Sequence, residues 1–290
     1  MASWRPSERV LRPARHGAFL AIAVYLVLLG SGHLPLAVDT HAYWSANPLA
    51  PYRQSQLGDF DAYFYSPAFA QVLWPLTRLP WGLFAALWTG ILIVAVYLQS
   101  GRWFGLVVPL VAVELAMGNI HLLLGLAVTA GLVWPAAWAF VLLTKITPGI
   151  GLLWFAVRRE LRPLVIAGLA TALFVVPSFI LSPGTWIDWV RLLSSPLGHW
   201  NGIEIPVLVR LPFAAALVVW GARTDRRWTF VIGCWLALPA LYWTSFAMLI
   251  ALIPVLDDSV PLARLAAKRR RPLERPPETV MEGPISTVGR

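Results

Sequence analysis

The chain has 290 residues, of which 58% are hydrophobic and 13% are charged, whereas soluble globular domains are about 45–50% apolar and about 25% charged. Its mean hydropathy of +0.68 excludes a soluble enzyme, a disordered protein, a coiled coil and a free-standing nucleic-acid binder. The net charge of +9 comes from the chain ends and short loops, so membrane lipids and no nucleic acid are the expected partners. The composition predicts an all-α, polytopic membrane helical bundle with roughly eight to ten membrane segments.

The first third of the sequence predicts one span and a long outward loop. Residues 1–16 form a basic N-terminus, and residues 17–38 form the first apolar run, so the N-terminus is expected in the cytoplasm. The break at 39–66 holds three acids and one base, which is typical of an outward loop. Residues 67–80 are too short and too rich in proline for a crossing, and they predict an interfacial or re-entrant helix.

The remaining apolar runs alternate with basic loops. The loops 158–162 and 222–227 are basic and are expected in the cytoplasm, whereas 182–204 is expected outside with an amphipathic helix. Counted from Arg102 in the cytoplasm, Arg158 is also cytoplasmic only if the run 136–157 enters and returns, bending near Lys145 and Pro148. Because both flanks of 228–256 are basic, that run is expected to form two short crossings that break at Pro239. The other apolar runs are 82–98, 103–117, 119–134, 163–181 and 205–221.

Three regions follow from this pattern. Residues 1–16 are the cytoplasmic N-terminus, residues 17–256 are the multi-span membrane domain, and residues 257–290 are predicted to be a disordered basic cytoplasmic tail. The expected location is the cell membrane, with both termini in the cytoplasm.

Asp39 is the first candidate for chemistry. It follows the first apolar run, where a carboxylate borders both water and a low-dielectric cleft and can act as a proton acceptor. Alternatively, Asp39 is a solvated loop acid without a catalytic role, and the same holds for Asp59 and Asp61 in this loop. The substrate-binding candidates in this loop are His41, Tyr43, Asp59, Asp61, Tyr63 and Tyr65.

Lys145 is the second candidate. A charged side chain at membrane depth costs roughly 2.5–3.5 kcal/mol, so its presence in an apolar stretch predicts a buried anion, and phosphate is a natural partner. The alternative is that Lys145 reaches the outer interface. Asn119 and His121, which follow Gly118, either bind a ligand or close a helix contact, and Arg78 either binds a lipid phosphate or reaches the interface.

The sequence contains no motif for nucleotide binding and no metal-ligand spacing. Cys234 is the single cysteine, so neither an internal disulfide nor a zinc framework is possible. No cofactor and no metal are therefore expected, and a transferase that acts at the outer face would need a lipid-linked donor.

Four stretches in order carry a family resemblance. They are Asp39 with Tyr43; Phe64-Tyr65-Ser66-Pro67 followed by Trp74-Pro75-Leu76; Gly118-Asn119 with Lys145-Ile-Thr-Pro148 and Arg158-Arg159; and Trp243 ahead of Ile253-Pro254. With these stretches the chain resembles the membrane glycosyltransferases of the GT-C class, specifically glycosyltransferase family 87, the polyprenol-phosphate-mannose-dependent mannosyltransferases. The chain is short for that family, and Gly-Asn stands where members often have Gly-Gln.

The resemblance implies a GT-C-like fold and the inverting transfer of a hexose, with mannose as the first candidate. The donor would be a polyprenyl-phosphate sugar, the acceptor would be a lipid or a glycan, and Asp39 would correspond to the acid that deprotonates the acceptor hydroxyl. Two alternatives stay open: a transporter or flippase of a lipid-linked sugar, and a shortened, non-catalytic family member.

Overall fold

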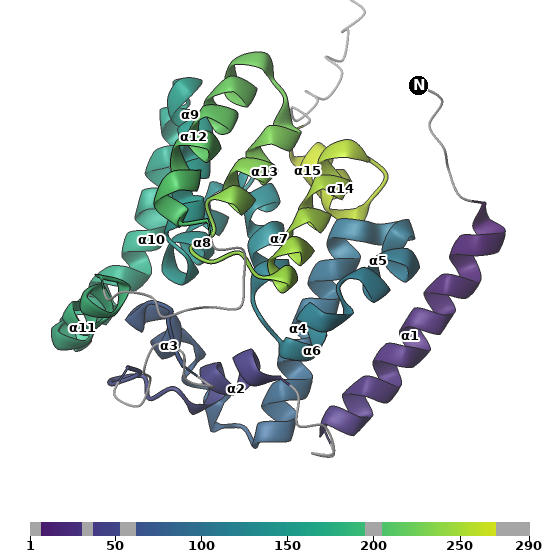
Figure 1. Cartoon of the computed structure of the whole chain (residues 1–290), viewed down its shortest axis with the longest axis horizontal. Coiled ribbons are helices and arrows are strands. Elements are labelled where there is room, and N and C mark those ends of the chain that lie inside the picture. The colour runs from purple at the N-terminus through teal and green to yellow at the C-terminus, as the bar shows by residue number, and fades with distance from the viewer. Residues whose placement is uncertain (1–6, 31–36, 53–61, 195–204, 271–290) are drawn as a thin grey trace, which may run out of the picture.

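The computed structural model describes residues 7–30, 37–52, 62–194 and 205–270, and its regular structure over these residues is helical, with no β-strand (Figure 1). The α-helices are α1 Glu8–Gly30, α2 Val38–Ser45, α3 Pro67–Leu73, α4 Trp81–Ser100, α5 Phe104–Leu110, α6 Ala112–Met117, α7 His121–Gly131, α8 Trp138–Thr144, α9 Leu153–Val157, α10 Leu161–Leu181, α11 Pro183–Ser194, α12 Val207–Thr224, α13 Arg227–Leu236, α14 Ile253–Leu256 and α15 Pro261–Arg270. The 3₁₀ segments are η1 Leu76–Arg78, η2 Gly101–Trp103, η3 Pro135–Ala137, η4 Thr147–Leu152 and η5 Trp243–Leu252.

Within these residues, four stretches are long and apolar enough to cross a membrane, and a fifth span arises if the bent pair Trp243–Leu256 and Pro261–Lys268 is counted as one. This confirms a helical membrane protein. The other apolar runs that the sequence analysis counts toward eight to ten segments form shorter helices between the long ones. The four stretches are Val10–Val27, Trp81–Leu110, Leu161–Leu181 and Val207–Thr224.

The predicted break in the run 136–157 is confirmed. α8 ends at Thr144, Lys145 has extended backbone angles, and the helix resumes only at Thr147. Pro148 occupies the first turn of η4, where a proline fits because its missing N–H would have no helical partner. The break leaves Lys145 between two short helices.

The predicted break at Pro239 is also confirmed, and Arg210 of α12 holds it. The Arg210 side chain is buried, with 5% of its surface exposed. Its guanidinium donates to the carbonyl groups of Leu236, Leu238 and Pro239, and to the carbonyl of Ile205, which lies just before α12. Leu236 is the last residue of α13, and Leu238 and Pro239 follow it, so their carbonyls have no helical donor. One planar cation therefore satisfies the turn between α13 and η5.

The two ends of the molecule differ in character. α2, α3 and α11 gather at one end of the longer helices (Figure 1), where Trp189 of α11 donates to Phe64 O at 3.1 Å. The loops that are predicted to be cytoplasmic lie at the other end (Figure 1). There Arg158 forms an ion pair with Asp225 at 3.1 Å, and Arg102 forms one with Asp257 at 2.7 Å. We call these the acidic-loop end and the basic end.

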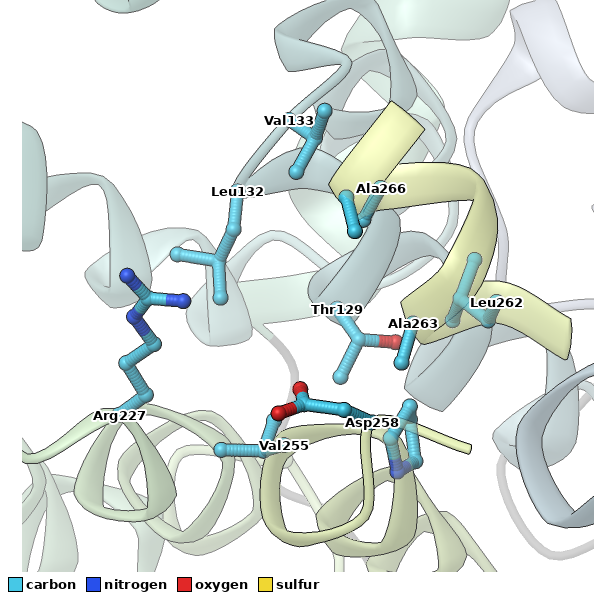
Figure 2. Close-up of a pocket in the computed structure, with 11 residues that line it drawn as sticks. Thr129, Leu132, Val133, Arg227, Val255, Asp258, Leu262, Ala263 and Ala266 are labelled. Atoms are coloured by element: carbon cyan, nitrogen blue, oxygen red, sulfur yellow. The ribbon is translucent and has the colours of Figure 1, made fainter. Parts of the chain in front are cut away.

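A hollow lies at the basic end (Figure 2). It is enclosed by the C-terminal end of α7, the start of α13 and the last two helices, and Arg227 and Asp258 are its charged lining residues. A neighbouring hollow contains Arg158, Asp225 and Arg227. Neither contains a residue that the sequence analysis selects as a site candidate.

Two boundaries differ from the sequence analysis. Asp39 does not end the first apolar run but lies in the first turn of the separate helix α2, which begins at Val38 after Ala37, a residue with left-handed backbone angles (φ 71°). Residues 261–270, which were assigned to the disordered tail, form α15. Leu262 and Ala263 are buried there, so apolar packing and the nearby Arg102–Asp257 ion pair stabilise this helix.

Candidate functional site

The short helix α2 is fastened to the bend at Gly118. Ala37 N–H donates to Ala116 O at 2.8 Å, and the Thr40 hydroxyl donates to Gly118 O at 3.4 Å. The Trp88 indole donates to the same carbonyl oxygen at 2.7 Å. Gly118 has a φ of 72°, which favours glycine. The bend that the sequence analysis singled out therefore positions the helix that carries Asp39.

The two faces of α2 have different surroundings. Asp39 and Tyr43 are four residues apart and share one face, whereas His41 lies on another. The His41 ring packs against Trp44 and Trp81, with ring centroids 5.4 and 5.0 Å apart. His41 thus belongs to an aromatic cluster at the start of α4, and Asp39 and Tyr43 face the interior of the site.

Tyr43 and Tyr65 form a buried pair of phenols. Their hydroxyl oxygens are 3.0 Å apart, and their side chains are 1% and 7% exposed. Burial raises the pKa of both hydroxyls, and the charge of Asp39 raises the pKa of each further. Next to this pair, Ser66 N–H donates to Leu143 O at 3.2 Å, which joins the segment containing Tyr65 to the end of α8 beside Lys145.

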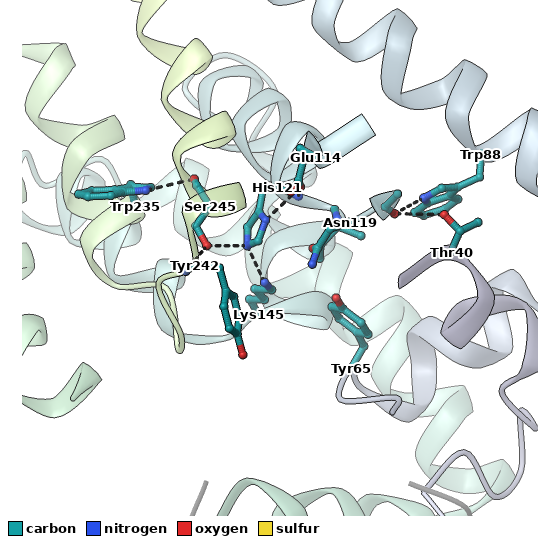
Figure 3. A network of polar contacts seen from close by, with 12 residues as sticks. Thr40, Tyr65, Trp88, Glu114, Asn119, His121, Lys145, Trp235, Tyr242 and Ser245 are labelled. Carbon is teal, nitrogen blue, oxygen red and sulfur yellow. Dashed lines mark hydrogen bonds and ion pairs between the residues drawn. The ribbon is translucent and has the colours of Figure 1, made fainter. Parts of the chain in front are cut away.

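A chain of polar contacts runs from α6 to Lys145 (Figure 3). Glu114 Oε1 accepts from the backbone N–H of His121 at 2.9 Å and lies 3.0 Å from His121 Nδ1. His121 Nε2 lies 2.8 Å from Lys145 Nζ. Glu114 and His121 are 1% and 0% exposed, whereas Lys145 is half-buried. This series of polar contacts therefore ends at the Lys145 ammonium, which is still partly exposed and can be reached by a ligand.

η5 and the Gly118 bend complete the surroundings of this chain. Ser245 Oγ lies 3.4 Å from His121 Nε2 and accepts from Tyr242 N–H at 3.0 Å. Asn119 is buried, and its side-chain oxygen accepts from Ile120 N–H at 2.7 Å. In Figure 3 the side chains of Tyr242, Lys145, Asn119 and Tyr65 occupy one region between η5 and the loop before α3.

Asp39 belongs to the same region. Its charge acts on Tyr43, Tyr65 and Tyr242, and on the Lys145 ammonium. Coulomb energy falls as the distance between two charges grows, and α2 is joined to the end of α8 through the Tyr43–Tyr65 and Ser66–Leu143 hydrogen bonds. Asp39 is half-buried. The acid and the cation that the sequence analysis selected thus converge on one site, with opposite charges that come from α2 and from the α8–η4 break.

Other candidates lie elsewhere. The Tyr63 ring packs against the Tyr65 ring with centroids 5.5 Å apart, but its hydroxyl donates to Ser66 O at 3.2 Å and not to the Tyr43–Tyr65 pair. The Arg78 guanidinium stacks 4.7 Å above the Trp74 ring. Asp59 and Asp61 lie outside the described residues.

Three site residues were missed by the sequence analysis. Glu114 lies inside the apolar run 103–117 and is not among the candidates that the sequence offers. Tyr242 and Ser245 are polar residues directly after the Pro239 break, and this position is the signal that could have identified them. Within the described residues, no group of three or more His, Cys, Asp or Glu side chains could hold a metal ion.

The fold and the site define a polytopic helical membrane protein with a polar site at its acidic-loop end. The chain belongs to glycosyltransferase family 87, whose match covers residues 63–267, most of its length. This membership supports a membrane glycosyltransferase. The match includes Tyr65, Asn119, His121 and Lys145, whereas Asp39 precedes it. No curated protein and no solved structure matches the chain.

Proposed function

We propose that the protein transfers a hexose, with mannose as the first candidate, from a polyprenyl-phosphate donor to a lipid or glycan acceptor at the outer face of the cell membrane. In this orientation the basic end, with the start of α1 and the end of α15, faces the cytoplasm, and the acidic-loop end faces outward. The observation that carries the proposal is that hydrogen bonds between Tyr43 and Tyr65 and between Ser66 and Leu143 join α2, which carries Asp39, to the end of α8 beside Lys145, in a chain of family 87.

Lys145 would bind the donor phosphate. An ammonium group offers three N–H donors and a compact positive charge, and the His121 contact uses one of the three. The half-buried position reduces competition by water, which strengthens the attraction between the ammonium and a phosphate. The apolar polyprenyl chain would remain in the surrounding membrane.

Asp39 would act as the general base. It accepts the proton of the acceptor hydroxyl while that oxygen forms a bond to the anomeric carbon, and the bond from this carbon to the phosphate oxygen breaks. The electron pair leaves with the polyprenyl phosphate, which gains negative charge that Lys145 stabilises. Attack opposite the leaving group inverts the anomeric configuration. General-base assistance contributes about 10²–10⁴-fold to such a step.

The aromatic surroundings suit the passage of a sugar and its acceptor. Tyr43 and Tyr65 are protonated phenols beside Asp39, so their hydroxyls can donate to or accept from sugar hydroxyls without adding charge. Asn119 adds an amide at the Gly118 bend. These groups offer neutral hydrogen bonds between the base and the cation, which is the position that the hexose would occupy.

The test is a reconstituted transfer assay. Proteoliposomes that contain the full chain receive polyprenyl-phosphate mannose radiolabelled in the sugar, with octyl α-mannoside or phosphatidylinositol as the acceptor. The proposal predicts labelled mannosyl acceptor with inverted configuration and one equivalent of released polyprenyl phosphate. Intact labelled donor that crosses the bilayer without bond cleavage would instead establish a transporter, and neither transfer nor movement would indicate a non-catalytic family member.

A further inference from the structure

The contact between Glu114 and His121 fixes which ring nitrogen carries the proton. A carboxylate oxygen accepts hydrogen bonds and cannot donate them. Because Glu114 Oε1 lies 3.0 Å from Nδ1, the proton belongs on Nδ1. The same oxygen accepts the backbone N–H of His121 at 2.9 Å. Two hydrogen bonds from one residue to one oxygen hold both the ring plane and the backbone at the start of α7.

This tautomer turns the other ring nitrogen into an acceptor aimed at Lys145. With Nδ1 protonated, Nε2 has a free lone pair, and the Lys145 ammonium donates to it over 2.8 Å. The order of charges is a buried carboxylate, a neutral imidazole and an ammonium. Without the Glu114 contact, Nε2 could carry the proton, and it would then face the ammonium as a second donor.

The inserted imidazole has a consequence for anion binding. A lysine in direct contact with a buried carboxylate would already have its charge neutralised, and a phosphate would have to compete with that partner. In this site a whole ring separates Glu114 from Lys145, and Coulomb attraction falls with distance. Lys145 is therefore held in place by a neutral acceptor, while its charge and two of its N–H donors are available to an incoming anion.

We propose that Glu114 and His121 are positioning residues that orient the Lys145 ammonium toward the phosphate of a polyprenyl-phosphate ligand. The proposal rests on the proposed function, because it takes Lys145 as the phosphate-binding group. It goes further by assigning a role to Glu114, and by giving His121 the indirect role of an acceptor that holds Lys145. Glu114 and His121 would not touch the transferred sugar.

Binding of polyprenyl phosphate alone tests the proposal without requiring sugar transfer. The full chain is purified into nanodiscs, and the dissociation constant of radiolabelled polyprenyl phosphate is measured. Glu114→Gln keeps an acceptor oxygen and should change the constant by less than about threefold, whereas Glu114→Ala should weaken binding by about tenfold or more, which is the loss of one hydrogen bond to a charged group. Thr129→Val, a buried change on α7 away from the chain of contacts, should bind as the wild type does.

His121 variants provide a second comparison if Glu114→Ala does not fold. A glutamine at this position can donate with its amide nitrogen and accept with its oxygen. His121→Gln should therefore retain most of the binding, whereas His121→Phe should lose about tenfold or more. A merely structural role predicts that the two variants differ in thermal stability and bind polyprenyl phosphate equally when folded, which would overturn the proposal.

The tautomer gives a spectroscopic readout. In protein labelled with ¹⁵N histidine, His121 should show a protonated Nδ1 in the wild type and in Glu114→Gln, and a shift toward a protonated Nε2 in Glu114→Ala. A protonated Nε2 in the wild type would overturn the proposal, and so would wild-type affinity in folded Glu114→Ala. If binding depends on Glu114 as predicted but no sugar is transferred, the positioning role stands and the proposed function fails.

Discussion

Lys145 has apolar neighbours in the sequence and polar neighbours in space. From the sequence, the cost of an ammonium in an apolar stretch predicts that it meets an anion. The structure supplies Glu114, but through His121, across residues that are far apart along the chain. The hydrophobic periodicity of the sequence cannot predict the Glu114–His121–Lys145 contacts, because these contacts depend on how α6, α7 and the α8–η4 break pack together. Residue type thus identified Lys145 as a site residue, and only the fold identifies the group that holds it.

The tyrosine pair shows a similar division. The loop sequence predicts Tyr43, Tyr63 and Tyr65 as aromatic surface for a sugar. In the structure all three rings are buried, but the Tyr63 hydroxyl donates to Ser66 O, whereas the hydroxyls of Tyr43 and Tyr65 contact each other. Composition predicts an aromatic surface near the site, but side-chain direction decides which hydroxyls serve it.

The Tyr43–Tyr65 pair predicts how stability depends on pH. Burial raises the pKa of the Tyr43 hydroxyl, so the folded state retains a proton that the unfolded chain releases above about pH 10. The pair therefore stabilises the fold fully below that pH, and its contribution is lost as the pH rises further. Tyr43→Phe should lower the free energy of unfolding by about 1 kcal/mol at pH 8 and make its decline above pH 10 less steep.

Thermal unfolding between pH 7 and pH 11 measures this effect. Thr129→Val removes another buried hydroxyl that does not titrate, so it should lower stability without changing the pH dependence. If Tyr43→Phe and the wild type decline with the same slope above pH 10, the Tyr43 hydroxyl does not retain its proton as described.

At the scale of elements, the long helices were predictable and the short ones were less so. The apolar runs 82–98, 163–181 and 205–221 correspond closely to α4, α10 and α12, since uninterrupted apolar length is a strong signal. Proline and glycine also marked the breaks near Pro148 and Pro239. The sequence could not show that Arg210 would satisfy the second break, because the carbonyls that it binds carry no residue-specific signal.

The position of α2 was the main element that the sequence did not predict. An apolar run from 17 to 38 predicts that Asp39 ends the first span, but Asp39 lies in the first turn of α2, which follows the left-handed Ala37. α2 is held instead by contacts with Ala116, Gly118 and α4. The orientation of Asp39 therefore depends on the Gly118 bend and not on α1.

This dependence predicts the effect of Gly118→Ala. A Cβ atom at Gly118 would overlap the Thr40 hydroxyl, and the φ of 72° would add about 1–2 kcal/mol of strain. The substitution should displace α2 and lower sugar transfer by about 10²-fold, the effect of a misplaced catalytic group. Initial rates in proteoliposomes measure it.

Gly90→Ala is the matched control. Nothing lies within 4 Å of a Cβ atom at Gly90, which is inside α4, so this change should preserve activity and favour the helix by about 1 kcal/mol. Wild-type transfer by Gly118→Ala would show that the bend does not position Asp39.

Across the whole molecule, the charges of the loops agree with the direction in which the helices run. The basic loops that were predicted to be cytoplasmic meet at one end through the Arg158–Asp225 and Arg102–Asp257 ion pairs. The site lies at the other end with α2, α3 and α11. The half-length helices α5 to α9 explain this arrangement, since they carry the chain to the site at Gly118 and at Lys145 and return it to the basic end at Arg158. Loop charge could predict which ends meet, but not how deep each short helix reaches.

Asp39 and Lys145 are proposed to perform different tasks in one site, and paired measurements of donor binding and turnover separate these two tasks. Asp39→Asn and Lys145→Met are compared with Asp188→Asn, a control at an exposed acid of α11. Asp39→Asn should bind polyprenyl-phosphate mannose within about threefold of the wild type and lose about 10²–10⁴-fold in turnover. Lys145→Met should weaken donor binding by about 10- to 100-fold. Unchanged turnover in Asp39→Asn would show that Asp39 is not the base, and unchanged donor affinity in Lys145→Met would show that Lys145 does not bind the donor phosphate.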